Sequence, residues 1–185
     1  MEIPKNPWKR LSRTEQRLFD FLTLIEDQVV FPDSTTGKYS FFSMKPCVIL
    51  IPEIEPGKFV MAGQWRYPTQ RFSWEFPLGG VSKWCADPAE YAQDAMREGL
   101  EETGYRAHDA TYLGKFCASH ANNDQDTYIF YSSHLSKERT IEANDREVQK
   151  VQLFSLDEII QMILKSEIQD GLTITALFHY LQRKT

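Results

Sequence analysis

The spacing of hydrophobic positions changes along the chain. A continuous aliphatic run, Cys47 to Ile51, is typical of a strand buried on both faces. Other apolar runs predict a strand pair or bent strand over 19–31 and further strands at 39–42, 58–65, 74–76, 110–116, 127–131 and 148–154. The first fifteen residues are mostly polar and are expected to form an arm. Strands, a central helix, more strands and closing helices together predict a mixed sheet flanked by helices.

The helices carry clear end signals. Asp87 is placed to cap the central helix, Pro88 suits its first position and Glu90 completes a capping-box pattern. Gly104 is placed to end that helix in a left-handed cap. A second capping box, Ser155 to Glu158, opens an apolar helical stripe, and a last helix is expected over 173–182.

The composition indicates a globular domain and argues against several other classes of protein. With 185 residues and 42% hydrophobic content, the chain fits one globular domain with a small N-terminal extension. The net charge of −5 disfavours a protein that binds a nucleic acid polymer through a basic surface. No apolar run is long enough for a membrane span or a secretion signal, so a cytoplasmic location is expected. Cys47, Cys85 and Cys117 are too scattered for a disulfide framework or zinc site and are predicted to be buried fillers.

Three carboxylates gather on the central helix. Glu98 and Glu102 fall at one edge of its apolar half, and Glu101 lies further round the same flank. Two carboxylates about 6 Å apart repel by about 3 kcal/mol at an effective dielectric constant of about 20, so a half-buried cluster requires a cation. Oxygen ligands favour Mg²⁺ or Mn²⁺. Arg97 is expected to steady Glu101. Taken alone, the glutamates fit a solvated acidic face better.

The surrounding residues favour the metal site. The run from Arg97 to Tyr105, REGLEETGY, resembles the core of the Nudix box. Gly99 stands where that box has an aliphatic residue, which predicts looser packing there. Ala89 occupies the position of an upstream glutamate. Gly80 lies three residues farther from Arg97 than in the box, which fits an insertion around residues 82–85.

The resemblance points to one group of Nudix hydrolases. The stretches QWRYP (64–68), WEFPLGG (74–80) and SEIQDGLTITAL (166–177) are similar to motifs of the ADP-ribose pyrophosphatase group. In place of that group's S-P-G-x-S-x-E loop, this chain has SHANND at 119–124. The resemblance implies a Nudix-type α/β/α sandwich over 46–185, an N-terminal β-extension over 1–45 that serves as a dimerisation arm, and a homodimer.

The resemblance also implies roles for individual residues. Metal ligands would be Glu98, Glu101, Glu102 and the backbone carbonyl of Leu78, and substrate contacts would be Arg66, Glu75, Gly79 and Gly80. The same three glutamates would be catalytic, together with a general base from the loop that holds Glu142, Asp145 and Glu147; Glu147 precedes the last strand as in the family pattern. For Arg66 the alternative is a surface salt bridge. For Glu75 it is a strand residue facing solvent.

The function implied is Mg²⁺-dependent hydrolysis of a nucleoside diphosphate derivative, with ADP-ribose giving AMP and ribose 5-phosphate. One alternative is another nucleoside diphosphate sugar, such as GDP-mannose. Another is a Nudix domain that binds a nucleotide without turning it over.

Overall fold

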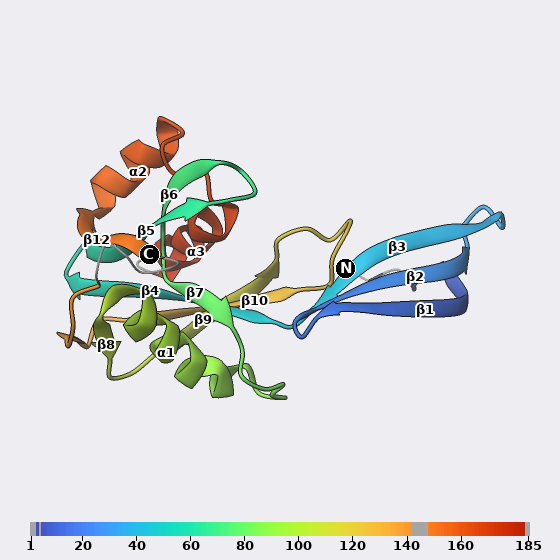
Figure 1. Ribbon diagram of the computed structural model, residues 1–185, viewed down its shortest axis with the longest axis horizontal. Coiled ribbons are helices and arrows are strands. Elements are labelled where there is room, and N and C mark those ends of the chain that lie inside the picture. The colour runs from blue at the N-terminus through green and yellow to red at the C-terminus, as the bar shows by residue number, and fades with distance from the viewer. Residues whose placement is uncertain (1–2, 4, 142–147, 184–185) are drawn as a thin grey trace. The chain divides into compact units, whose positions relative to one another are not determined.

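The chain folds into two compact units. The computed structural model describes residues 3, 5–141 and 148–183. Contacts divide these into an N-terminal unit, Met1–Lys45 with Ser119–Gln125, and a main unit, Pro46–Ala118 with Asp126–Thr185. Figure 1 shows the elements of both.

The N-terminal unit is an antiparallel sheet of β1 (Lys9–Phe19), β2 (Leu22–Val30) and β3 (Thr36–Met44). The prediction of an arm over the first fifteen residues is wrong from Lys9 onward, where β1 begins. Every side chain of β1 is exposed, so no alternation of buried and exposed positions marks it as a strand. Its pairing with β2 holds it instead, and the chain between 19 and 31 contains a turn before β2.

The SHANND loop belongs to the N-terminal unit rather than to the strands that it connects. Asp124 accepts hydrogen bonds from the backbone N–H of Met44 (2.9 Å) and the hydroxyl of Ser43 (2.8 Å). The hydroxyl of Tyr39 donates to the carbonyl of Ala121 at 2.7 Å. These bonds attach the loop to β3.

The main unit contains a mixed seven-stranded sheet, as expected. Its order is β12-β5-β4-β10-β9, with β6 beside β5 and β7 beside β4. The bounds are β4 (Cys47–Glu55), β5 (Lys58–Arg66), β6 (Arg71–Glu75), β7 (Leu78–Gly80), β9 (Thr111–Cys117), β10 (Asp126–Ser132) and β12 (Val148–Ser155). Strands β4 and β10 are parallel, and the other neighbours are antiparallel. Two short strands that the pattern does not predict, β8 (Tyr105–Ala107) and β11 (Leu135–Lys137), pair with each other.

Two hydrophobic cores cover the two faces of this sheet. Along β4, Ile49 and Ile51 enter one core, and Val48 and Leu50 enter the other. The first core is closed by α2 (Leu156–Leu164) and α3 (Gly171–Arg183), and the second by α1 (Ala92–Thr103) (Figure 1). The α/β/α arrangement is therefore confirmed, because the continuous aliphatic run of β4 faces helices on both sides.

The helices end at the predicted capping residues, except that a 3₁₀ turn precedes α1. Gly104 ends α1 with a φ of 75°, and Ser155 and Glu158 form the capping box of α2. Asp87 accepts a hydrogen bond from the N–H of Ala89 at 2.9 Å, but the turn it caps is a 3₁₀ turn, Pro88–Tyr91, that precedes α1. The buried Tyr91 exchanges hydrogen bonds with the backbone of Cys85, which anchors this turn to the preceding loop.

The three cysteines differ in burial. Cys47 is buried as predicted, but Cys85 and Cys117 are only partly buried, since both lie where the main sheet and its helices give way to loops. Across the described residues, no helix combines the length and hydrophobicity needed to cross a membrane.

Candidate active site

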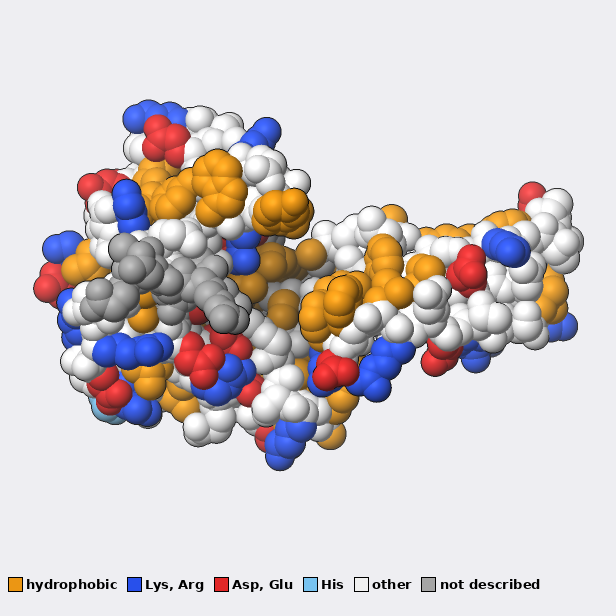
Figure 2. Space-filling view, in the orientation of Figure 1, with side chains coloured by type: hydrophobic (Ala, Val, Ile, Leu, Met, Phe, Trp, Pro, Cys, Tyr) orange, Lys and Arg blue, Asp and Glu red, His pale blue; other side chains and the backbone are white. Residues whose placement is uncertain are grey.

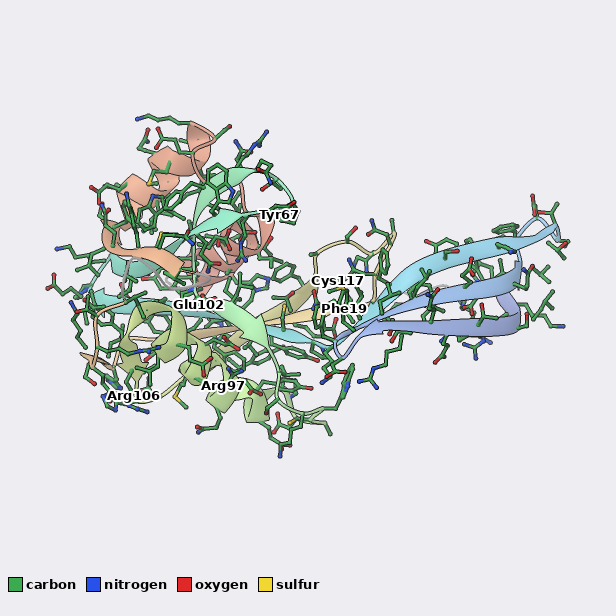
Figure 3. All side chains as sticks on the ribbon, viewed as in Figure 1. Phe19, Tyr67, Arg97, Glu102, Arg106 and Cys117 are labelled. Atoms are coloured by element: carbon green, nitrogen blue, oxygen red, sulfur yellow. The ribbon has the colours of Figure 1, made fainter. Side chains whose placement is uncertain are left out.

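Helix α1 places its three glutamates at different depths. Glu102 is 6% exposed, the side chain of Glu98 is 13% exposed, and that of Glu101 is 53% exposed. Figure 3 labels Glu102 and Arg97 on this helix. Since neighbouring positions on a helix point in different directions, Glu98 and Glu102 turn toward the sheet while Glu101 turns toward solvent.

Glu102 joins α1 to two strands. Its Oε2 accepts a hydrogen bond from the N–H of Leu78 (3.1 Å), and its Oε1 accepts one from Nε2 of Gln64 (3.3 Å). The pKa of Glu102 is raised to about 8, chiefly by burial and also by the nearby charge of Glu98, whereas the Leu78 N–H acts in the opposite direction. A cation at this site would relieve the cost of keeping both carboxylates ionised.

Glu98 lies directly against β7. A Cβ atom built on Gly79 would lie 2.1 Å from the carboxyl carbon of Glu98, so only a glycine leaves room for this carboxyl. At Gly80 a Cβ would meet nothing within 4 Å. The glycine at 79 therefore brings the strand backbone next to a candidate metal ligand.

Arg97 binds two of the three glutamates. It donates to Oε2 of Glu101 (2.8 Å), as expected, and also to Oε1 of Glu98 (2.6 Å) and the carbonyl of Gly80 (3.1 Å). Within the part of the chain that the structure describes, no three Asp, Glu, His or Cys side chains are grouped closely enough to hold a metal ion. The predicted ligands are thus near one another, but Arg97, Gln64 and the Leu78 N–H engage them.

Arg66 and Glu75 form a partly buried ion pair at the edge of the sheet. Nε of Arg66 donates to Oε1 of Glu75 at 3.0 Å, and Nη2 donates to Oε2 at 2.5 Å. Glu75 is 2% exposed, so the alternative of a solvent-facing strand residue is wrong. The hydrogen bonds that Arg66 donates to Glu75 raise the pKa of Arg66 above the ordinary value of an arginine. Arg66 does form a salt bridge, but one that reaches a buried carboxylate.

A pocket of about 740 Å³ opens beside this ion pair. The β5–β6 hairpin and the segment that leads into α3 enclose it, and Arg66, Glu75 and Leu78 are among its lining residues. Leu78, a predicted metal ligand, therefore lines the same pocket as the predicted substrate residues Arg66 and Glu75. The candidate general bases Glu142, Asp145 and Glu147 lie outside the described residues.

Two aspartates near the site had no role in the sequence analysis. Asp94, on α1, is 7% exposed and accepts hydrogen bonds from the N–H (3.1 Å) and hydroxyl (3.3 Å) of Ser82. It holds the loop before α1 at Ser82, and its sequence signal is a charge among the apolar positions of α1. Asp170 lines the pocket and accepts a hydrogen bond from the N–H of Thr173 at 2.7 Å. The sequence feature that could have identified Asp170 is its position just before the last helix.

Comparison with known proteins finds relatives over most of the chain. The chain is 29% identical over 164 residues to an ADP-ribose pyrophosphatase of Bacillus subtilis (strain 168), covering 88% of this chain and 86% of that protein. It is 31% identical over 158 residues to a methanol dehydrogenase activator of Bacillus methanolicus, covering 84% of this chain and 82% of that one.

The fold has a solved counterpart. A crystal structure of an ADP compounds hydrolase superposes with a TM-score of 0.77 at 17% identity, over 98% of this chain and 96% of that one. The model of the NUDIX domain matches residues 45–176, which include the main sheet, α1 and the pocket. The chain therefore belongs to the NUDIX family and is a Nudix hydrolase.

Proposed function

We propose that the chain catalyses Mg²⁺-dependent hydrolysis of the pyrophosphate bond in a nucleoside diphosphate derivative, with ADP-ribose as the first candidate. Water would attack one phosphorus, the bridging P–O bond would break, and the products would be AMP and ribose 5-phosphate. The similarity to a Bacillus subtilis ADP-ribose pyrophosphatase supports the choice of substrate.

One observation carries the proposal: Glu98 and Glu102 both lie against the Leu78–Gly79 backbone. Glu102 accepts the N–H of Leu78, and Glu98 packs on Gly79. Carboxylates and a strand carbonyl are the hard oxygen donors that Mg²⁺ prefers, so the residues present fit this ion. Glu98, Glu102 and the Leu78 carbonyl would hold it, with Glu101 as a further ligand. When bound, Mg²⁺ supplies charge neutralisation for the pyrophosphate and lowers the pKa of the attacking water.

The other candidate residues would have the following roles. Arg66 lines the pocket, is oriented by the hydrogen bonds that its Nε and Nη2 donate to Glu75, and would bind pyrophosphate oxygens through its remaining N–H groups. Gly79 and Gly80 would let the substrate approach the backbone of β7. Arg97 would release Glu98 to the ion and keep Glu101 in place. Glu147 is our candidate for the base that takes the proton of the attacking water.

A substrate panel with matched variants tests the proposal. The wild type, Glu98→Gln, Glu102→Gln and the control Glu90→Gln are assayed with ADP-ribose and GDP-mannose in Mg²⁺, Mn²⁺ or EDTA. Glu90 is an exposed acid on the 3₁₀ turn before α1. We expect AMP from ADP-ribose, loss in EDTA, and a fall of about 100-fold or more in kcat for Glu98→Gln and Glu102→Gln but not for Glu90→Gln. Unchanged thermal melting shows that the variants fold.

The alternatives give different results. Release of GMP from GDP-mannose without AMP from ADP-ribose would contradict the substrate assignment and leave the chemistry in place. Tight nucleotide binding without turnover in any divalent ion would favour a binding module over an enzyme.

We also propose that the protein is a cytoplasmic homodimer. Three free cysteines suit a reducing compartment. Large apolar side chains are exposed on the N-terminal unit, namely Trp8, Leu11, Leu18, Phe19, Phe21 and Phe42. Figure 2 shows hydrophobic side chains along this sheet. An exposed apolar surface of this kind is typical of a protein–protein contact.

A further inference from the structure

The pocket beside Arg66 has a second wall that the hydrolytic chemistry does not use. Trp65 and Phe72 contribute exposed aromatic surface to it, at 54% and 38% exposure. Thr69, Ser73 and Gln169 add polar groups. A wall of aromatic faces and hydrogen-bonding groups is typical of a site for a ring that carries hydroxyls.

The charges of the lining residues favour a neutral group over a phosphate. Its carboxylates are Glu75, Glu167 and Asp170, against the guanidinium groups of Arg66 and Arg71. Arg66 is paired with Glu75, and Arg71 donates a hydrogen bond to Gln169. Apart from the Arg66–Glu75 pair, two carboxylates stand against one guanidinium group, so the part of the pocket away from Arg66 disfavours anions. The uncharged portion of a nucleoside diphosphate derivative fits it better.

Asp170 is a lining carboxylate whose position is fixed by a hydrogen bond. It is half-buried, and the N–H of Thr173 holds its Oδ2 at 2.7 Å. Burial and the neighbouring charge of Glu75 raise its pKa. A fixed carboxylate in a partly dry setting forms strong hydrogen bonds with hydroxyl donors, and aspartates bind ribose hydroxyls in this way in dinucleotide sites.

We propose that this pocket binds a ribose of the substrate and that Asp170 accepts hydrogen bonds from its vicinal hydroxyls, which makes Asp170 a specificity-determining residue. The inference rests on the proposed pyrophosphate hydrolysis. ADP-ribose contains two such sugars, the nucleoside ribose and the terminal ribose, and the recognition chemistry is the same for both.

The test compares three substrates with three proteins. The substrates are ADP-ribose, its analogue without the 2-hydroxyl on the nucleoside ribose, and its analogue without that hydroxyl on the terminal ribose. The proteins are the wild type, Asp170→Asn and Asp87→Asn. Asparagine caps helices as well as aspartate does, so both variants keep their caps. Asp87 is a matched control because it also caps a helical turn but does not line the pocket.

We expect one deoxy analogue to raise the wild-type KM about tenfold, with kcat changed less than about twofold. The affected analogue identifies which ribose is bound. Asp170→Asn should raise the KM for ADP-ribose by a similar factor and lose the preference for the hydroxyl, and Asp87→Asn should retain both. A wild type that treats all three substrates alike would overturn the proposal without any variant. So would an Asp170→Asn protein that keeps the wild-type preference.

Failure of the proposed function is a separate result. If the wild type releases no AMP, calorimetric binding of the same compounds to wild type and Asp170→Asn still tests the ribose site. Binding that depends on both the hydroxyl and Asp170 supports it, and binding that depends on neither overturns it.

Discussion

At the scale of single residues, the surroundings separate side chains that are chemically identical. Three glutamates fall within five consecutive positions of α1, yet their surroundings differ. Glu98 lies against Gly79, Glu101 pairs with Arg97 in solvent, and Glu102 is buried. Gly79 leaves the space that the carboxyl of Glu98 fills.

A methyl group at that position tests its importance. We predict that Gly79→Ala displaces the Glu98 carboxyl, raises the Mg²⁺ concentration for half-maximal activity and lowers kcat about tenfold or more, since small displacements of catalytic groups cost this much. Gly80→Ala is the comparison, because a Cβ there meets nothing within 4 Å and leaves the Glu98 carboxyl in place. We expect it to change only the KM for the substrate and to keep the Mg²⁺ dependence of the wild type. Titration of activity with Mg²⁺ measures both. Equal behaviour of the two variants would contradict the assignment of Glu98.

At the scale of elements, α1 packs closely on β4. Gly99 stands where the Nudix box has an aliphatic residue, and the expectation of looser packing there is wrong. A Cβ at Gly99 would lie 2.6 Å from Cδ2 of Leu50, so the strand side chain already fills the space. The side chain of Leu50 thus occupies the volume that a side chain at position 99 would need.

This packing predicts the effect of restoring the aliphatic residue. Gly99→Leu should destabilise the protein by about 1–3 kcal/mol through overpacking, although leucine forms helices better than glycine. Adding Leu50→Ala should recover part of the loss because it frees the volume. Urea unfolding of the single and double variants gives these free energies, and a Gly99→Leu protein as stable as the wild type would show that α1 can shift.

The strands β1 and β2 are joined by a cross-strand ion pair. Arg13 and Asp27 are direct register partners, and Nε and Nη2 of Arg13 each donate to Asp27 at 2.7 Å. The hydrogen bonds from Arg13 lower the pKa of Asp27. The pair therefore contributes its full stability above the ordinary pKa of an aspartate and loses it as pH falls through the lower folded-state value.

Asp27→Asn should lower the unfolding free energy by about 1 kcal/mol at neutral pH, and the difference from wild type should shrink toward zero in acid. Asp20→Asn is the control, since the Arg17–Asp20 pair is solvent-exposed, and we expect it to change little. Urea titrations monitored at the N-terminal unit, at neutral pH and near pH 2, measure both. A deficit that grows in acid would contradict the role given to Asp27.

At the scale of the whole molecule, the exposed apolar side chains of the N-terminal unit predict self-association. We expect a mass near twice 21.6 kDa by light scattering. Replacing Leu11, which is 54% exposed on β1, by glutamate should shift the mass toward the monomer, whereas Arg17→Glu at an exposed polar position on β1 should not. A wild type that remains monomeric at all concentrations would contradict the dimer.

The sequence by itself determined the features that arise from local pattern. The two-sided aliphatic run of β4, the Ser155 capping box and the Gly104 cap follow from neighbouring residues, and the structure has them. The REGLEETG run identified the family through residues that lie together on one helix, which the NUDIX match confirms.

Only the tertiary structure decided what depends on distant partners. The burial of Glu75, the raised pKa of Glu102 and the contact of Glu98 with Gly79 arise from segments separated in the chain. The strand β1 has no buried face, and the SHANND loop attaches to β3, so neither shows in local periodicity. Hydrophobic spacing reports which side of an element is covered. It does not report which polar groups from elsewhere the fold brings against it.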